Sequence, residues 1–186
     1  DDFVIGVQHK WEAEGALKDL AERLKLFGLE LSREKTRLIE FGRFAKENVK
    51  GTGKKRPETF DFLGFTHYLT NTRDGRFMVK VKTARKRTNR AMVGMNQWLK
   101  GVRNLAKLES IWKMLVLKLQ GHYNYYGVSG NFESIKRFHW KTIRLTFKWL
   151  NRRSQKKSWN MDSFRKYLET YPLPKPKLTY AIYNTW

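Results

Sequence analysis

The hydrophobic pattern of the chain changes near residue 83 from the period of a strand to that of successive helices, and this change limits the folds that the chain can adopt. In residues 77–81 apolar and polar side chains alternate, which is the period of a half-buried strand. In residues 91–105 apolar side chains recur at spacings of three and four, as in an amphipathic helix. We therefore expect an α+β fold with two parts, residues 1–82 and residues 83–186.

The first part is expected to mix short strands with one helix. Its helix should cover residues 11–27 and end at Gly28, which can adopt the left-handed backbone that stops a helix. We expect this helix to lie on a sheet. Extended segments are predicted at residues 4–7, 29–31 and 38–41, a loop at 42–59, and a β-hairpin formed by residues 60–68 and 77–81 around a turn at 71–75.

The second part is expected to be helical. Three amphipathic helices are predicted over residues 91–105, 108–126 and 135–149, a basic connector at 151–158 and a short helix at 162–168. Three prolines between residues 172 and 176 then end the regular structure.

Positive charge is concentrated in this helical part. The whole chain carries 39 Lys and Arg against 17 Asp and Glu, a formal net charge of +22. Residues 1–80 hold 16 of the basic and 13 of the acidic residues, so residues 81–186 hold 23 and 4, together with six of the seven Trp. Cations combined with flat aromatic side chains favour a nucleic-acid partner.

Other features of the composition exclude several classes of protein. The chain has no Cys, which excludes disulfides, thiol catalysis and cysteine-ligated zinc, and its four His lack metal-ligand spacing. A bound metal would therefore be held by oxygen. No window has the apolar length of a membrane span, and the first residues lack the features of a signal peptide. We expect a cytoplasmic protein with no membrane partner, associated with RNA or the nucleoid.

Asp1 and Asp2 precede the apolar segment at residues 4–7. Two adjacent carboxylates in this position are a candidate site for Mg²⁺, because hard divalent cations prefer oxygen ligands. A pair of solvated acids is the alternative interpretation.

Three segments in order resemble the reverse transcriptases encoded by bacterial group II introns. They are the Asp-Asp pair, the stretch Leu-Ser-Arg-Glu-Lys-Thr at residues 31–36, and Phe-Leu-Gly-Phe at residues 62–65. The resemblance implies that Asp1 and Asp2 are catalytic metal ligands and that Lys35 assists the leaving pyrophosphate as a general acid. It also implies that Phe62, Leu63, Gly64 and Phe65 form the element that grips the primer end.

Each of these residues also has a structural interpretation. Lys35 beside Glu34 can be a solvated surface pair, and Phe62 and Phe65 can be core aromatics. Gly64 can relieve crowding in a strand or allow a nucleic-acid backbone to approach. The fingers and the earlier palm strand of the family have no counterpart in this sequence, nor has its Cys/His-rich endonuclease segment. We therefore expect these residues alone neither to polymerise nor to cleave a DNA target.

Two basic clusters and one aromatic run are the candidate RNA-binding residues. Four cations fall in six residues near the start of the first predicted helix, four more lie in the connector, and two tyrosines of the run at residues 122–131 cannot both face inward. The candidates are Arg85, Lys86, Arg87, Arg90, Tyr123, Tyr125, Arg152, Arg153, Lys156 and Lys157. The aromatic run, residues 132–138 and residues 150–154 resemble the thumb and maturase region of group II intron proteins.

Together these resemblances predict the last part of a polymerase palm followed by a helical thumb and maturase domain. The expected function is RNA-directed DNA synthesis by the whole protein, with Mg²⁺ as cofactor, combined with binding and splicing of intron RNA. Expected partners are group II intron RNA, an RNA template with its DNA primer, and deoxynucleoside triphosphates. Two alternatives are a non-catalytic RNA-binding or RNA-folding module and a reverse transcriptase of a defence or diversity-generating system.

Overall fold

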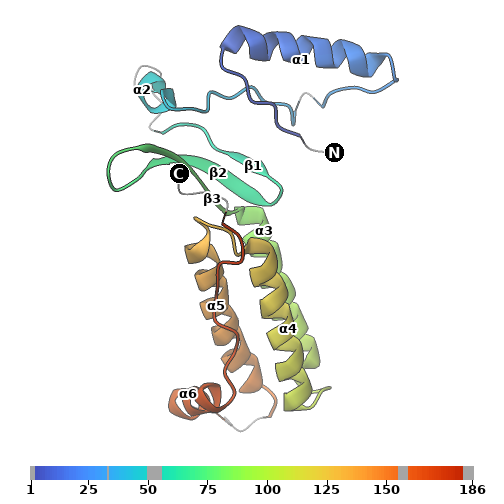
Figure 1. Cartoon of the computed structure of the whole chain (residues 1–186). Coiled ribbons are helices and arrows are strands. Elements are labelled where there is room, and N and C mark those ends of the chain that lie inside the picture. The colour runs from blue at the N-terminus through green and yellow to red at the C-terminus, as the bar shows by residue number, and fades with distance from the viewer. Residues whose placement is uncertain (1–2, 33, 50–55, 155–158, 182–186) are drawn as a thin grey trace. The chain divides into compact units, whose positions relative to one another are not determined.

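The computed structural model of the chain describes residues 3–32, 34–49, 56–154 and 159–181. The chain forms two compact units (Figure 1). The first unit comprises residues 1–63 and 67–79, and the second comprises residues 64–66 and 80–186. The boundary was expected after residue 82, which is three residues beyond residue 79, the last residue of the first unit.

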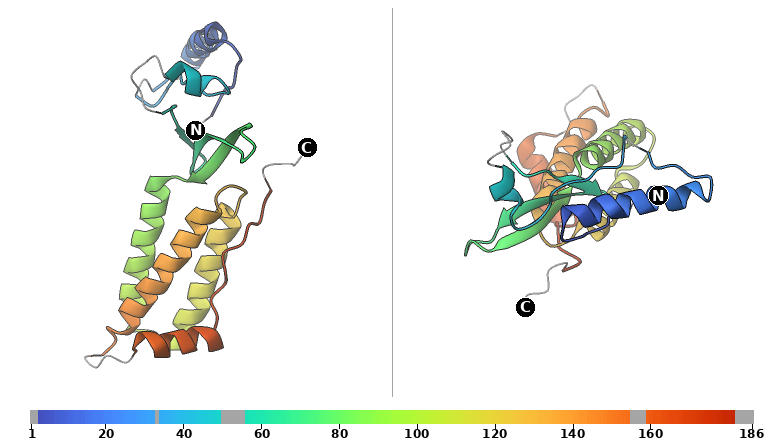
Figure 2. Two further views of the ribbon diagram at one scale, coloured as in Figure 1. Left: turned by 90° about the vertical axis from the view of Figure 1, so that its left-hand side faces the viewer. Right: turned by 90° about the horizontal axis from the view of Figure 1, so that it is seen from above.

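The second unit is built from four helices: α3 (Arg85–Val102), α4 (Leu108–Tyr126), α5 (Phe132–Leu150) and α6 (Met161–Thr170). The helices α3, α4 and α5 run side by side, and α6 lies across the end of this bundle at which α5 ends (Figure 2). The first three were predicted from helical spacing and α6 as a further short helix, and the basic cluster lies on the first turns of α3 as expected. Asn160 caps α6, because its side-chain oxygen accepts a hydrogen bond from the backbone N–H of Ser163 at 2.7 Å.

One apolar core joins these helices. Leu115 and Leu119 of α4 are completely buried, at i and i+4 positions that share one face of the helix. Ile135 of α5 is also completely buried. Two core positions of α5 are polar: Thr142 and Thr146, of which the second donates its hydroxyl to the backbone oxygen of the first at 2.9 Å. The apolar members of the core are Met95, Leu99, Ile111, Trp112, Leu115, Leu119, Tyr123, Ile135, Phe138, Trp149, Leu150, Phe164 and Leu173.

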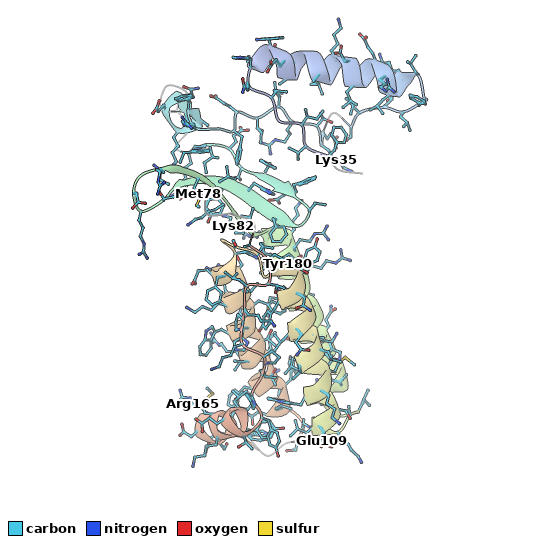
Figure 3. The ribbon with its side chains drawn as sticks, viewed as in Figure 1. Lys35, Met78, Lys82, Glu109, Arg165 and Tyr180 are labelled. Atoms are coloured by element: carbon cyan, nitrogen blue, oxygen red, sulfur yellow. The ribbon has the colours of Figure 1, made fainter. Side chains whose placement is uncertain are left out.

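Residues 171–180, here named the C-terminal strap, run back along α4 after α6 (Figure 1). The indole Nε1 of Trp112, near the start of α4, donates to the backbone oxygen of Tyr171 at 3.1 Å. At the other end Tyr180 forms a parallel bridge with Val128, just after α4 (Figure 3). Leu173 is buried between these points. The strap therefore spans the length of α4 and closes one side of the core.

The first unit contains α1 (Lys10–Lys25), α2 (Ala45–Val49) and much of a three-stranded antiparallel sheet. Its strands are β1 (Phe60–Phe62), β2 (Phe65–Asn71) and β3 (Phe77–Thr83), in the order β1-β2-β3. The predicted β-hairpin is confirmed, as is the helix expected over residues 11–27, which ends at Lys25, three residues before Gly28 with its φ of 68°. β2 and β3 continue into the second unit, and Thr83 lies just before α3.

Tight turns join the strands. Leu63 and Gly64 connect β1 to β2 with φ values of 47° and 84°, and two central residues of positive φ define a type I′ hairpin turn. Between β2 and β3 the backbone N–H of Thr72 donates to the Arg76 carbonyl at 2.8 Å, and Gly75 has φ 79°. These turns set the register of the sheet.

Three predictions for the first unit were wrong. The segments at 4–7, 29–31 and 38–41 form no strand, because a strand needs a hydrogen-bonded neighbour and the described residues place none beside them. The helix α1 buries none of its residues, so the expected packing on a sheet is not seen. A short helix, α2, interrupts the predicted loop at 42–59. Among the described residues no helix is long and apolar enough to cross a membrane.

Candidate nucleic-acid interface

The residues expected to carry catalysis are not brought together by the described structure. Asp1 and Asp2, the predicted magnesium ligands, lie outside the described residues. Lys35 is exposed in a loop of the first unit, where its backbone N–H donates to the Ser32 carbonyl at 3.1 Å (Figure 3). No three His, Asp or Glu side chains converge in the ranges that the structure covers. We derive no chemical step from this arrangement.

The turn after β1 carries part of the predicted primer-binding element into the second unit. Gly64 accepts a hydrogen bond through its carbonyl from the backbone N–H of Ala84 at 2.9 Å, directly before α3. A Cβ atom at Gly64 would lie 3.4 Å from Oη of Tyr126 and 3.8 Å from Cγ of Arg87. The turn therefore packs closely on the start of α3 and the end of α4, and φ 84° at this position favours glycine.

We name Gly64, Phe65, Arg87, Tyr125 and Tyr126 the turn cluster. The Phe65 ring stacks nearly parallel to that of Tyr125, with centroids 6.2 Å apart, and meets the Tyr126 ring edge-on at 5.4 Å. The two tyrosine rings are 4.7 Å apart, also edge-on. Tyr126 is half-buried, whereas 56% of Tyr125 is exposed. The cluster thus presents one aromatic side chain to solvent on a base of packed rings.

Cations occupy the first turns of α3, the helix that contributes Arg87 to the turn cluster. Arg85, Lys86, Arg87 and Arg90 are all exposed on the first turns of α3. Burial raises the pKa of the Tyr126 hydroxyl, with a smaller contribution from Tyr125, and the nearby Arg87 guanidinium opposes this rise. These cations lie at the N-terminal end of α3, where the helix dipole is also positive. The first turn of α3 contains no acidic residue that would balance this charge. Such an arrangement is relieved by an anionic ligand.

Tyr123 has a different role from the one expected. Only 1% of it is exposed, and its hydroxyl forms a 2.7 Å hydrogen bond with Nδ1 of His139. Burial raises the pKa of the Tyr123 hydroxyl and lowers the pKa of His139. The Tyr123 ring is part of the core and cannot stack on a base. Of the two tyrosines predicted to contact RNA, Tyr123 and Tyr125, only Tyr125 remains a candidate.

A second group of cations gathers around Trp149 at the end of α5. The guanidinium carbon of Arg103 lies 4.9 Å from the Trp149 ring centroid, Nζ of Lys148 lies at 5.1 Å, and the guanidinium carbon of Arg152 lies at 5.4 Å. Arg153 donates to the Ala106 carbonyl at 3.1 Å. We name Arg103, Lys148, Trp149, Arg152 and Arg153 the tryptophan cluster. Three cations lie on one ring, and within the described residues none of them forms a salt bridge with a carboxylate, which favours a bound phosphate.

The sequence identified only part of this second group. Arg152 and Arg153 were predicted as RNA-binding residues, whereas Lys156 and Lys157 lie outside the described residues. Arg103 and Lys148 were missed, because their proximity depends on the packing of α3 against α5. The helical spacing of Trp149 predicted its burial but gave no sign of the cations around it.

Comparison with family models finds no match, and neither a curated protein nor a solved structure matches the chain.

Proposed function

We propose that this chain forms the C-terminal part of a group II intron reverse transcriptase and maturase, in which the second unit binds intron RNA and the template–primer duplex. The observation that carries the proposal is the turn cluster. It joins Gly64 and Phe65 of the Phe-Leu-Gly-Phe segment to Tyr125 of the aromatic run and Arg87 of the basic helix. Three separate sequence signals thereby meet in one surface, which supports a common role for them.

The chemistry of the turn cluster suits a nucleic-acid strand. The exposed Tyr125 ring offers a face on which a base can stack, and the cations at the start of α3 neutralise phosphates. Gly64 has no Cβ, so the turn can lie close to Tyr126 and Arg87 and holds Phe65 beside Tyr125. The tryptophan cluster supplies a second set of cations in the same unit.

The catalytic part of the proposal follows from the resemblance alone. In the whole enzyme Asp1 and Asp2 would hold Mg²⁺, which neutralises charge developing on the transferred phosphoryl group. Lys35 would protonate the leaving pyrophosphate, and the segment at 62–65 would position the primer end. Asp2→Ala in a complete polymerase should abolish DNA synthesis and leave RNA affinity nearly unchanged. Equal loss of both activities would contradict this division.

Competition binding tests the RNA-binding part. The 186-residue chain is offered a folded group II intron RNA against an unstructured RNA of equal length, in about 0.2 M salt, where binding by many phosphate contacts is weakened about 10³-fold or more. We expect a clear preference for the folded intron. Replacing Arg85, Lys86, Arg87 and Arg90 together by Gln should weaken binding and flatten its salt dependence. Equal affinity for both RNAs would contradict the maturase assignment.

The matched control uses cations away from both clusters. Lys113 and Lys118 of α4, Lys166 of α6 and Lys175 of the C-terminal strap are four exposed cations of the same unit. Replacing them by Gln should change binding to the folded intron less than the substitutions in α3, although each removes a charge. Similar effects for both sets would show that net charge, and not the turn cluster, governs affinity.

A non-catalytic RNA-binding module is the second candidate. It is favoured by one observation: both cation clusters belong to the second unit, where the described residues bring no acidic groups together. A metal-independent preference for folded RNA, with no nucleotide incorporation by a complete polymerase that contains this sequence, would select this candidate.

A further inference from the structure

A groove of about 940 Å³ runs between α3, α5 and α6, entirely within the second unit. Binding sites for small molecules have volumes of about 300–1,000 Å³, so the groove has room for a single nucleotide. It is lined by Asn89, Met92, Val93, Asn96, Lys141, Ile143, Arg144, Leu145, Phe147, Lys148, Met161 and Phe164. We name it the α3–α5–α6 groove.

Apolar side chains line much of this groove although it is open to solvent. Val93 of α3 is 54% exposed and Met161 of α6 is 49% exposed. The ring of Phe147 is held against that of Phe164, with centroids 5.3 Å apart. Aromatic rings and thioethers make favourable contacts with the flat face of a base, whichever base it is.

The rim of the groove is cationic. Lys141, Arg144 and Lys148 stand at i, i+3 and i+7 on α5, a spacing that places all three on one side of the helix. Successive members are about 4.5 and 6 Å apart along the helix axis, since an α-helix rises about 1.5 Å per residue. Among the twelve lining residues there is no carboxylate. The charge of the rim is therefore complementary to a chain of phosphates.

Asn96 provides a hydrogen-bonding group of known orientation on the α3 side. Its Oδ1 accepts a hydrogen bond from the indole Nε1 of Trp149 at 2.9 Å. An indole N–H can only donate, so this contact fixes which end of the amide is oxygen. The Nδ2 group is left as a donor, and the edge of a base offers carbonyl and ring-nitrogen acceptors.

We propose that the α3–α5–α6 groove binds one unpaired nucleotide of a folded RNA. The base lies against the apolar lining, the Asn96 amide donates to its edge, and Lys141, Arg144 and Lys148 contact the flanking phosphates. Lys148 also belongs to the tryptophan cluster, so the strand continues from the groove toward Arg103 and Arg152. This inference rests on the proposed RNA binding and adds selection for an unpaired nucleotide within a folded structure.

The test compares two RNA hairpins that differ only in one bulged nucleotide. The full 186-residue chain should bind the bulged hairpin at least about 5-fold more tightly than the fully paired one, which corresponds to the gain from one stacked base. A bulge that carries an abasic site should lose this gain. Equal affinity for the bulged and paired hairpins overturns the inference while leaving the proposed RNA binding intact, whereas absence of binding to either hairpin contradicts the proposed function itself.

Variants locate the effect in the groove. Val93→Trp should fill the groove and remove the preference for the bulged hairpin, while binding to the paired hairpin stays within about 2-fold. Leu117→Trp is the matched control, because Leu117 is also exposed and apolar but lies on α4 outside the groove. Arg144→Gln should lower the slope of log affinity against log salt by about one unit. An equal loss of preference in both Trp variants overturns the assignment.

Two further measurements do not depend on the folding of a variant. In the unmodified chain, 4-thiouridine at the bulge should crosslink on irradiation to peptides containing Met92, Phe147 or Met161. Crosslinks confined to other elements overturn the proposal. An acidic peptide would also match the cationic rim, so oligoglutamate serves as competitor. Displacement of the bulged RNA by oligoglutamate at equal charge concentration would assign the groove to a protein partner instead.

Discussion

Leu63 has a backbone conformation that its side chain disfavours. Its φ is 47°, and it is the one residue other than glycine with positive φ in the described part of the chain. The side chain is mostly exposed, so little packing offsets this conformation. Leu63→Asn should raise the free energy of unfolding by about 1 kcal/mol, because Asn tolerates the left-handed region better. Leu63→Ala, which keeps a Cβ but cannot form local side-chain hydrogen bonds, should give no such gain. Urea denaturation measures both, and a destabilised Asn variant would contradict the expectation.

His122 couples the stability of the helical unit to pH. Its ring stacks on Phe138 with centroids 3.6 Å apart, and burial lowers the pKa of His122 to about 4. The unfolded chain binds this proton near the ordinary pKa of about 6.5, so stability is full above that pH and falls as the pH drops from 6.5 toward 4. The loss from this residue should reach about 1 kcal/mol at pH 5.5.

Thermal melting between pH 7.5 and 5.0 checks this expectation. His122→Gln cannot titrate and should flatten the dependence of Tm on pH, although burial also lowers the pKa of His139, which retains part of the slope. His9→Gln is the control, because His9 is exposed on the first unit. An unchanged slope in the His122 variant would show that other groups dominate acid destabilisation.

At the scale of elements, Asn131 holds the end of β3 against the turn between α4 and α5. Its buried amide oxygen accepts from the backbone N–H of Thr83 at 2.7 Å, and its Nδ2 donates to the Thr83 hydroxyl at 2.9 Å and to the Tyr126 carbonyl at 2.8 Å. Asn131→Ala removes the partner of the Thr83 N–H and hydroxyl, whereas the Tyr126 carbonyl keeps its hydrogen bond from the backbone N–H of Val128. We expect a loss of about 3 kcal/mol in the free energy of unfolding, since each unsatisfied buried polar group costs about 1–3 kcal/mol.

Urea denaturation with a constant m value would establish this loss. Asn124→Ala, an exposed position on α4, is the matched control and should change stability by less than about 0.5 kcal/mol. Comparable effects of the two substitutions would contradict the structural role assigned to Asn131.

Helices could be predicted better than the contacts between them. The spacing of Leu115, Leu119 and Tyr126 indicates α4 directly, because helical period is a local property. The segments at 4–7 and 29–31 are equally apolar but form no strand, because pairing depends on a neighbour that a local pattern cannot specify. The tryptophan cluster was missed for the same reason, since Arg103 and Arg152 meet only through the packing of α3 on α5. The three catalytic candidates Asp1, Asp2 and Lys35 remain predictions from resemblance.

At the scale of the whole second unit, Gly127 makes room for the C-terminal strap. A Cβ atom at this position would lie 2.3 Å from the backbone oxygen of Tyr123 and 2.7 Å from that of Lys177. Gly127→Ala must therefore displace the strap, which lowers the free energy of unfolding and opens the Lys177–Leu178 bond to cleavage by trypsin. Gly121→Ala is the control: its Cβ would meet nothing within 4 Å, and in the interior of α4 it should stabilise by about 1 kcal/mol.

Limited proteolysis and thermal melting separate the two glycine variants. We expect rapid cleavage within the strap for Gly127→Ala and resistance for Gly121→Ala. Equal resistance would mean that the strap adapts to the added methyl group without detaching.

The position of the strap has a consequence for the order in which the protein is completed during translation. α3, α4 and α5 leave the ribosome first and can pair through local contacts, which form quickly. The partners of Trp112 and Val128 in the strap lie more than fifty residues later, so these contacts form only after the strap has been synthesised. A nascent chain therefore passes through a stage with assembled helices and an uncovered α4. During this stage the basic surface of the helices is already exposed, so under the proposed function RNA can bind before the core is finally closed.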